Sequence, residues 1–299
     1  MSTIRLIEAS LRTDQGRVRE HNEDFVTCWE PSNANEEKQH GWLYILADGV
    51  GGAEAGEVAS QYASERTVKH YLATSDEPDW SRRLARAIQS ANRDLRQLVA
   101  HGEGSRMATT MVAAVITDQR AILANVGDSR GYLWRKGRLR QITKDQSLVA
   151  KLVEEGAITE SEARNHPRKN VILYSLGSDK KPKIDVYTVK LEPDDVLLLC
   201  SDGLTRHISD DEIELAVTRQ EPSEATQTLI SLANSRGGED NISVAIIRQD
   251  GRQAAAQKKI ITGRYNEPVR GQTVLWIYTF LLALVQTILI ITVWLLLRV

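Results

Sequence analysis

The chain has 299 residues, 41% hydrophobic and 26% charged, enough to bury one substantial core or two small ones. Its formal net charge is −2, and no stripe of Lys and Arg with interleaved aromatic residues occurs, which argues against a nucleic acid partner. Cys28 and Cys200 stand far apart, which disfavours a disulfide framework and a zinc cluster and favours a reducing compartment.

The first third of the chain combines short apolar runs with two long helical segments. Residues 80–100 carry apolar side chains at three- and four-residue spacing, the pattern of an amphipathic helix. The pattern predicts strands at residues 4–12, 25–29 and 42–47, a loop at 31–40, and helices at 53–72 and 80–100.

From residue 109 the pattern changes to short apolar or alternating segments joined by turns, which indicates an antiparallel meander. Its strands are expected at residues 109–116, 121–126, 131–135 and 139–142. The remainder predicts a helix over 146–164 with a break at Gly156, strands at 184–189, 196–200 and 242–247, and helices at 210–218 and 224–235.

The C-terminal part differs from the rest. Residues 249–272 read as a linker, and residues 274–297 lack any charge, a length that spans about 36 Å as a helix. A single transmembrane helix is therefore expected at residues 273–297; a buried core helix is the less favoured alternative. Four Lys and Arg residues between 258 and 270 precede the span, whereas only Arg298 follows it. With no signal peptide at the N-terminus, this bias predicts a large N-terminal domain that faces the cytoplasm and is tethered to the cytoplasmic membrane.

Acidic residues recur at the ends of apolar runs, most of them beside Gly or Asn. An Asp-Gly pair such as Asp48-Gly49 is by itself usually a turn, but Glu23-Asp24, Asp128, Asp202 and Asp240 stand in the same kind of context. Carboxylates without a His or Cys cluster favour Mg²⁺ or Mn²⁺ over zinc. Two such ions about 3.5–4 Å apart can share a carboxylate and activate a water, which suits phosphoester hydrolysis.

Six ordered motifs together resemble those of the metal-dependent type-2C protein phosphatases, the PPM family, in its bacterial branch. They are Arg19 with Asn22-Glu23-Asp24; Asp48-Gly49-Val50-Gly51-Gly52 with Gly56-Glu57-Val58-Ala59-Ser60; Thr109-Thr110; Asn125-Val126-Gly127-Asp128-Ser129-Arg130; Cys200-Ser201-Asp202-Gly203-Leu204; and Gly238-Glu239-Asp240-Asn241-Ile242-Ser243. The resemblance covers residues 5–248. It implies an α+β fold over residues 1–248, a four-layer α-β-β-α sandwich of two antiparallel sheets flanked by helices.

The resemblance also implies a role for each site residue. Arg19 would receive the substrate phosphate, for which its forked guanidinium is suited. Two core Mn²⁺ or Mg²⁺ ions would be bridged by Asp48, with a third, more weakly held ion beside them. The remaining metal contacts would come from Glu23 and the carbonyl of Gly49 on one core ion, Asp202 and Asp240 on the other, Asp24 through bound water, and Asp128 with Asp202 on the third ion.

Three positions depart from the family pattern. Val50 stands where many eukaryotic relatives carry a histidine proposed to protonate the leaving group. Either a metal-bound water or another side chain would then protonate the leaving oxygen; His166 is a candidate, although a lone His beside Pro is more often a surface or cap residue. Ala108 replaces a glycine, and Tyr174 stands where the family commonly has arginine, which leaves details of substrate docking open.

The sequence therefore predicts a phosphatase that hydrolyses phosphoserine or phosphothreonine by direct attack of a metal-bridged water or hydroxide. Its expected partners are phosphorylated proteins, including a serine/threonine kinase and its substrates, with a monomeric catalytic domain. The alternative is a pseudophosphatase that binds metal and phosphoproteins without turnover; no expected ligand is missing. The motif of phosphatases with an aspartyl nucleophile is absent.

Overall fold

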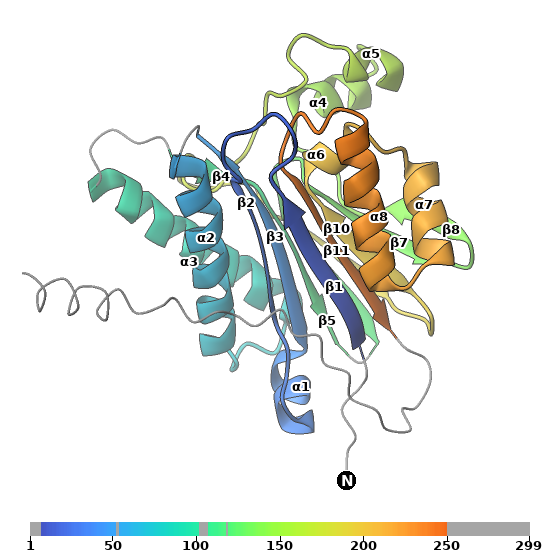
Figure 1. The fold of residues 1–299 in the computed structure, drawn as a ribbon. Helices are drawn as coiled ribbons and strands as arrows, with labels where there is room; N and C mark the ends of the chain where they lie inside the picture. The colour runs from blue at the N-terminus through green and yellow to red at the C-terminus, as the bar shows by residue number, and fades with distance from the viewer. Residues whose placement is uncertain (1–6, 52–53, 102–106, 118, 250–299) are drawn as a thin grey trace, which may run out of the picture. The chain divides into compact units, whose positions relative to one another are not determined.

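The computed structural model describes residues 7–51, 54–101, 107–117 and 119–249, which form two antiparallel β-sheets with helices on their outer faces (Figure 1). One sheet has the strand order β1-β11-β10-β7-β8. Its strands are β1 (Ile7–Asp14), β7 (Arg130–Arg135), β8 (Arg138–Gln141), β10 (Val196–Cys200) and β11 (Ile242–Gln249). We call it the first sheet.

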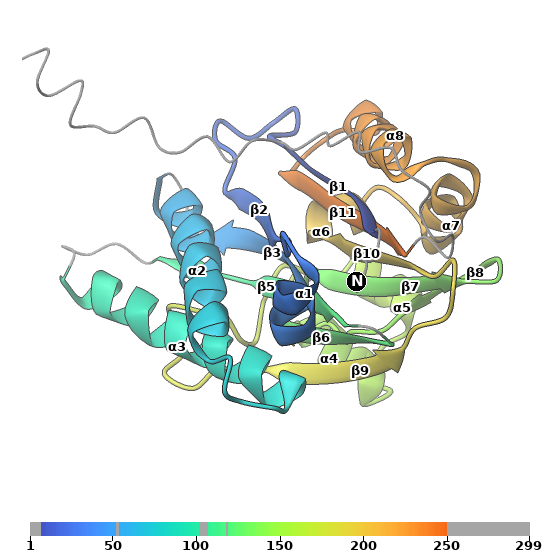
Figure 2. The ribbon, with the colours of Figure 1, turned by 90° about the horizontal axis from the view of Figure 1, so that it is seen from below.

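The second sheet has the order β2-β3-β5-β6-β9, and a short strand, β4, also pairs with β3. Its strands are β2 (Asp24–Trp29), β3 (Trp42–Val50), β4 (Ala108–Thr109), β5 (Met111–Ile116), β6 (Arg120–Val126) and β9 (Asp185–Lys190). Figure 2 shows the two sheets side by side, with α2 and α3 on the outside of one and α7 and α8 on the outside of the other.

The helices have the following bounds: α1 (Ala34–His40), α2 (Glu54–Ala73), α3 (Trp80–His101), α4 (Leu148–Glu154), α5 (Glu160–Arg164), α6 (Asp202–Thr205), α7 (Asp210–Arg219) and α8 (Pro222–Ser235). Each sheet packs on both of its faces, because successive side chains along a strand point to opposite sides of the sheet. In β3, Leu43 and Ile45 join the core beneath α2 and α3, whereas Tyr44 and Leu46 join the core between the sheets.

A third core packs α7 and α8 against the first sheet and includes Leu198, Ile213 and Leu229. Leu197 and Leu199 of the same strand point the other way, into the core between the sheets. The expectation of two antiparallel sheets flanked by helices is therefore confirmed.

Two expectations about local structure are wrong. The single meander over residues 109–142 is in fact two hairpins in different sheets: β5 pairs with β6, β7 pairs with β8, and the chain passes between the sheets at Gly127, whose φ is 104°. Residues 34–40 form α1 rather than a loop, because the side chain of Asn33 accepts the backbone N–H groups of Asn35 and Glu36 and so begins a helix.

The expected helix over 146–164 is divided into α4 and α5, as the break at Gly156 predicted; the φ of Gly156 is 70°. Among the residues that the structure describes, no helix is long and apolar enough to cross a membrane. The expected span, residues 273–297, and all but the first residue of the expected linker lie outside the described residues.

Candidate metal centre

Asp24 and Asp48 face each other across neighbouring strands of the second sheet. They are paired in the antiparallel register of β2 and β3: Asp24 is the first residue of β2, and Asp48 lies near the C-terminal end of β3. Glu23 directly precedes β2, and its carbonyl accepts the N–H of Gly49 at 3.0 Å. Pairing of these two strands alone thus brings together three of the acidic residues singled out in the sequence.

The backbone of Asp48 is fixed by the Thr109-Thr110 pair. The Asp48 carbonyl accepts the N–H of Thr110 and the hydroxyl of Thr109, each at 2.8 Å. Both threonines are fully buried. Because three hydrogen-bonding groups hold one peptide unit, the Asp48 side chain starts from a fixed point, and these threonines serve the site as positioning residues.

Two glycines leave room around the Glu23 carboxylate and the Asp48 backbone. A Cβ at Gly49 would stand 2.3 Å from the carbonyl oxygen of Gly56 and 2.6 Å from that of Glu23. A Cβ at Gly56, in the first turn of α2, would stand 2.6 Å from the carboxyl carbon of Glu23. The carboxylate of Glu23 therefore lies directly over a backbone that only glycine leaves open.

Asp202 and Asp240 come from the first sheet. Asp202 follows β10 and begins α6, and Asp240 precedes β11, the neighbour of β10. The two connections are joined by Ser201 and Ser243, since the Ser201 N–H donates to the Ser243 carbonyl at 3.1 Å and the Ser243 N–H donates to the Ser201 hydroxyl at 3.0 Å. Adjacent strands thus place both aspartates at the same end of the sheet.

Asn241 links the two halves of the site, a role that the sequence did not reveal. Its side-chain oxygen accepts the N–H of Glu23 at 2.8 Å, and its side-chain nitrogen donates to the carbonyls of Gln15 and His21, each at 2.9 Å. These partners lie more than 200 residues away in the chain. Asn241 therefore ties β11, beside Asp240, to the segment that carries Arg19 and Glu23.

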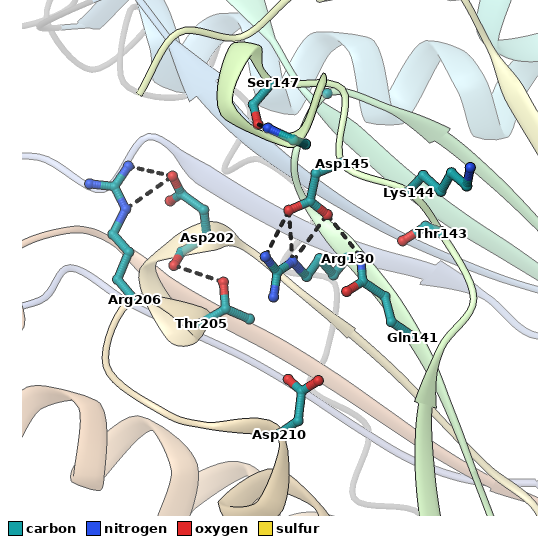
Figure 3. A network of polar contacts seen from close by, with 12 residues as sticks. Arg130, Gln141, Thr143, Lys144, Asp145, Ser147, Asp202, Thr205, Arg206 and Asp210 are labelled. Atoms are coloured by element: carbon teal, nitrogen blue, oxygen red, sulfur yellow. Dashed lines mark hydrogen bonds and ion pairs between the residues drawn. The ribbon is translucent and has the colours of Figure 1, made fainter. Parts of the chain in front are cut away.

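Asp128 lies at the passage between the sheets, where Thr110 and Ser129 share a buried hydroxyl contact of 2.9 Å. The next residue, Arg130, donates from Nε and Nη2 to both oxygens of Asp145 at 2.7 to 3.0 Å, as Figure 3 shows. Gln146 follows, and its side chain accepts the Gly127 N–H at 2.9 Å. The segment that leads into α4 is thereby bound to the turn that carries Asp128.

The aspartates raise one another's pKa values. Burial raises the pKa of Asp48 well above its usual range, and the neighbouring charges of Asp24, Asp202, Asp128 and Asp240 raise it further. Burial, opposed by hydrogen bonds from Ser243 and Ser201, raises the pKa of Asp24 to about 7; burial and Asp202 raise that of Asp128 to about 8. Carboxylates from both sheets therefore form one electrostatically coupled group.

Two arginines contact the carboxylates of this group. Arg19, with a side chain 45% exposed, places Nη2 2.8 Å from Oδ1 of Asp240. Arg206 donates to Oδ2 of Asp202 and lies 3.5 Å from Oδ2 of Asp240. Arg206 was not singled out in the sequence; the available signal was its spacing of four residues from Asp202, which places both side chains on one helical face.

The residues present fit divalent cations. Oδ2 of Asp24 and Oδ1 of Asp128 are buried without a hydrogen-bond partner, a costly arrangement that a cation relieves. All side-chain donors are carboxylates, which suit Mg²⁺ and Mn²⁺. Within the described part of the chain no three acidic, His or Cys side chains form a ready-made cluster around one point, and Asp202 and Asp240 are instead paired with arginines.

The departures from the family pattern have different settings. Val50 is 39% exposed at the end of β3, beside Asp48 and Gly49. His166 lies after α5, and its Nδ1 accepts the backbone N–H of Arg168 at 3.1 Å, the contact of a cap residue. Tyr174 packs against the core beneath α2 and α3, so this position serves packing here.

Comparisons with known proteins identify the family of the chain. Residues 19–241 match the protein phosphatase 2C family. A serine/threonine phosphatase, stp, of Listeria welshimeri is 40% identical over 267 residues, covering 83% of this chain and 100% of that protein. The crystal structure of the serine/threonine phosphatase PstP/Ppp of Mycobacterium tuberculosis is 35% identical, with a TM-score of 0.72 over 82% of this chain and 99% of that one.

A further structure, the catalytic domain of the serine/threonine protein phosphatase PstP in complex with two manganese ions, is 35% identical with a TM-score of 0.69, covering 81% of this chain and 97% of that one. The family match spans most of the chain, and the coupled carboxylates lie within it. The chain belongs to the protein phosphatase 2C family.

Proposed function

We propose that the chain is a protein serine/threonine phosphatase that depends on Mn²⁺ or Mg²⁺ and removes phosphate from phosphoserine or phosphothreonine. The observation that carries the proposal is geometric: Asp24 lies opposite Asp48 on paired strands, Asp202 and Asp240 lie at one end of two adjacent strands, and buried oxygens of Asp24 and Asp128 lack hydrogen-bond partners. The relatives named as serine/threonine phosphatases support the substrate class, and the manganese in one of them supports the cofactor.

In this proposal Asp48 would hold two ions, one together with Glu23 and the Gly49 carbonyl and the other together with Asp202 and Asp240. Asp24 would contact them through water, and Asp128 would contribute to a third, weaker site. Divalent cations here supply an activated water and stabilise the charge that develops on the phosphate. The ionised carboxylates of the site accept hydrogen bonds and donate none, so they would hold the cations and leave donation to the phosphate to Arg19.

Arg19 binds and orients the phosphate. Its fork can donate two hydrogen bonds to phosphate oxygens, and its exposure lets a substrate reach it. Its present partner, Asp240, holds the side chain at the edge of the site at 2.8 Å. Val50 has no proton to give, and Nδ1 of His166 is occupied by a backbone N–H, so in this proposal the leaving oxygen takes its proton from water.

The experiment uses full-length protein in a neutral detergent and follows phosphate release from a phosphothreonine peptide. With Mn²⁺ the wild type turns over the peptide, and excess EDTA abolishes turnover. Asp48→Asn lowers kcat/KM by at least about 10³-fold, because it removes the shared negative ligand. Asp211→Asn, an exposed aspartate in the first turn of α7, is the matched control and keeps wild-type turnover. Undiminished activity in EDTA would contradict the proposal.

The same experiment separates the alternative function. A pseudophosphatase binds the phosphopeptide with Mn²⁺ present but releases no phosphate. Every residue expected to contact a cation is present, and the buried oxygens of Asp24 and Asp128 still lack hydrogen-bond partners, so nothing in the described site favours the alternative.

We also propose that the phosphatase domain, residues 1–248, is monomeric and tethered to the cytoplasmic membrane. The support is the uncharged run at residues 274–297 and the excess of Lys and Arg before it. A serine/threonine kinase at that membrane, and its substrates, are the proposed partners, because anchoring raises their local concentration. Deleting residues 273–299 is expected to move the protein from the membrane to the soluble fraction; unchanged membrane association would refute the anchor.

A further inference from the structure

The guanidinium of Arg206 contacts the same carboxylates that are assigned to one cation. Its Nε donates to Oδ2 of Asp202 at 3.1 Å, and its Nη2 donates to the same oxygen. Its Nη1 lies 3.5 Å from Oδ2 of Asp240. Figure 3 shows the guanidinium turned toward the Asp202 carboxylate.

The position of Arg206 is set by the short helix α6. Arg206 is the C-cap residue of α6, and its backbone N–H donates to the carbonyl of Asp202 at 2.9 Å. Residues four apart on a helix lie on one face, so the side chain returns along α6 to the carboxylate at its start. Its side chain is 25% exposed, so ions in solution can reach the pair.

A guanidinium and a divalent cation compete for such oxygens. An oxygen that already accepts two hydrogen bonds from a cationic group has less charge and fewer lone pairs to offer a metal. The two positive groups also repel each other at close range. Arg19 differs, because among the described residues its ion pair is with Asp240, through Oδ1, and its side chain is more exposed.

We propose that Arg206 is an internal counterion of the metal centre: it pairs with Asp202 and Asp240 when cations are scarce, stabilises the protein in that state, and lowers its affinity for the cations. The inference rests on the proposed role of these two aspartates as metal ligands. Arg206 then sets the concentration of free Mn²⁺ or Mg²⁺ at which the protein becomes loaded.

Isothermal titration of full-length protein in neutral detergent with Mn²⁺ alone tests the proposal. Arg206→Gln removes the charge, Arg206→Lys keeps it, and Arg219→Gln removes an equal charge from the exposed end of α7. Arg206→Gln is expected to bind Mn²⁺ about three- to tenfold more tightly than the wild type. Arg206→Lys and Arg219→Gln are expected to stay within about twofold of it.

Thermal unfolding in EDTA gives a second readout. Arg206→Gln is expected to melt about 2–4 °C below the wild type, because Asp202 and Asp240 lose a partner, whereas Arg219→Gln does not. If the wild type binds Mn²⁺ and Arg206→Gln binds it equally or more weakly, Arg206 is not a counterion and the metal centre stands. If neither protein binds Mn²⁺, the metal centre itself is refuted.

Discussion

At the scale of single residues, Gly56 leaves the space that the Glu23 carboxylate occupies. Glycine in a helix costs about 1 kcal/mol relative to alanine, so Gly56 in the first turn of α2 is unfavourable by helix propensity alone. The carboxylate of Glu23 occupies the space that a Cβ would fill. The glycine at position 56 is therefore explained by the space that Glu23 needs and not by the helix.

Gly56→Ala is expected to weaken Mn²⁺ binding about tenfold, because the added Cβ displaces the Glu23 carboxylate. The melting temperature in EDTA is expected to stay within a few degrees of the wild type, because the higher helix propensity of alanine offsets the cost of this displacement. Titration calorimetry measures the first and thermal unfolding the second. In a Glu23→Ala background the same change should have little further effect on binding. Equal losses in both backgrounds would show that Gly56 does not act through Glu23.

At this scale the sequence predicted the acidic residues and their kind of context, and the structure brings them together. The sequence did not reveal the roles of Asn241 and Arg206. Asn241 acts on the N-H of Glu23 and on carbonyls more than 200 residues away, a relation that only the pairing of sheets creates. The role of Arg206 depends on α6, a helix of four residues whose length lies below what periodicity can detect.

At the scale of elements, a polar network joins four segments near Asp128. Arg130 of β7 binds Asp145 before α4, and its Nη1 donates to the Tyr132 hydroxyl at 3.1 Å. That hydroxyl in turn donates to Asp210, at the start of α7, at 3.1 Å. Gln141, at the end of β8, donates to Oδ1 of Asp145 at 2.8 Å. The network fixes the turn that carries Asp128 between its neighbours.

Arg130→Met is expected to lower the free energy of unfolding by about 3 kcal/mol, because it leaves the partly buried Asp145 without its cation. Urea unfolding followed by tryptophan fluorescence measures the loss. The double variant Arg130→Met/Asp145→Leu should recover part of it, since both charges are then removed. A double variant as unstable as the sum of the two single variants would contradict a pairwise role.

The elements themselves were predicted where periodicity was strong and missed where local chemistry decided. The strands around Leu43 and Leu198 and the helix over 80–100 follow from apolar patterning. The passage of the chain between the sheets at Gly127 could not be predicted from the sequence. Two consecutive hairpins show the same local sequence pattern whether they belong to one sheet or to two. The helix α1 rests on its Asn33 cap and has no buried residue, so hydrophobic periodicity gave no signal.

At the scale of the whole molecule, the coupled carboxylates affect stability. The folded pKa values of Asp24 and Asp128, about 7 and about 8, lie above the value of about 4 for an aspartate in an unfolded chain. Between these values the folded protein holds protons that the unfolded chain has released. The free energy of unfolding therefore falls as pH rises through this window, when no divalent cation is present.

Without cations, the melting temperature of the wild type is expected to fall from pH 5 to pH 8 relative to that of Asp24→Asn, which has no proton to lose at that position. Groups outside the coupled carboxylates, such as His40 with its lowered pKa, titrate in both proteins and cancel in the difference. Mn²⁺ should reverse the trend, because cations favour the deprotonated carboxylates. A difference that stays constant with pH would contradict the raised pKa.

The proposed metal centre requires that two cations share the Asp48 carboxylate at the ends of the two sheets. Anomalous diffraction from crystals grown with Mn²⁺, collected on both sides of the manganese absorption edge, locates the ions themselves. Two strong peaks are expected to contact the Asp48 carboxylate, one also beside Glu23 and the other also beside Asp202 and Asp240. Manganese peaks that leave Asp48 without contact, or a single peak beside it, would refute this arrangement.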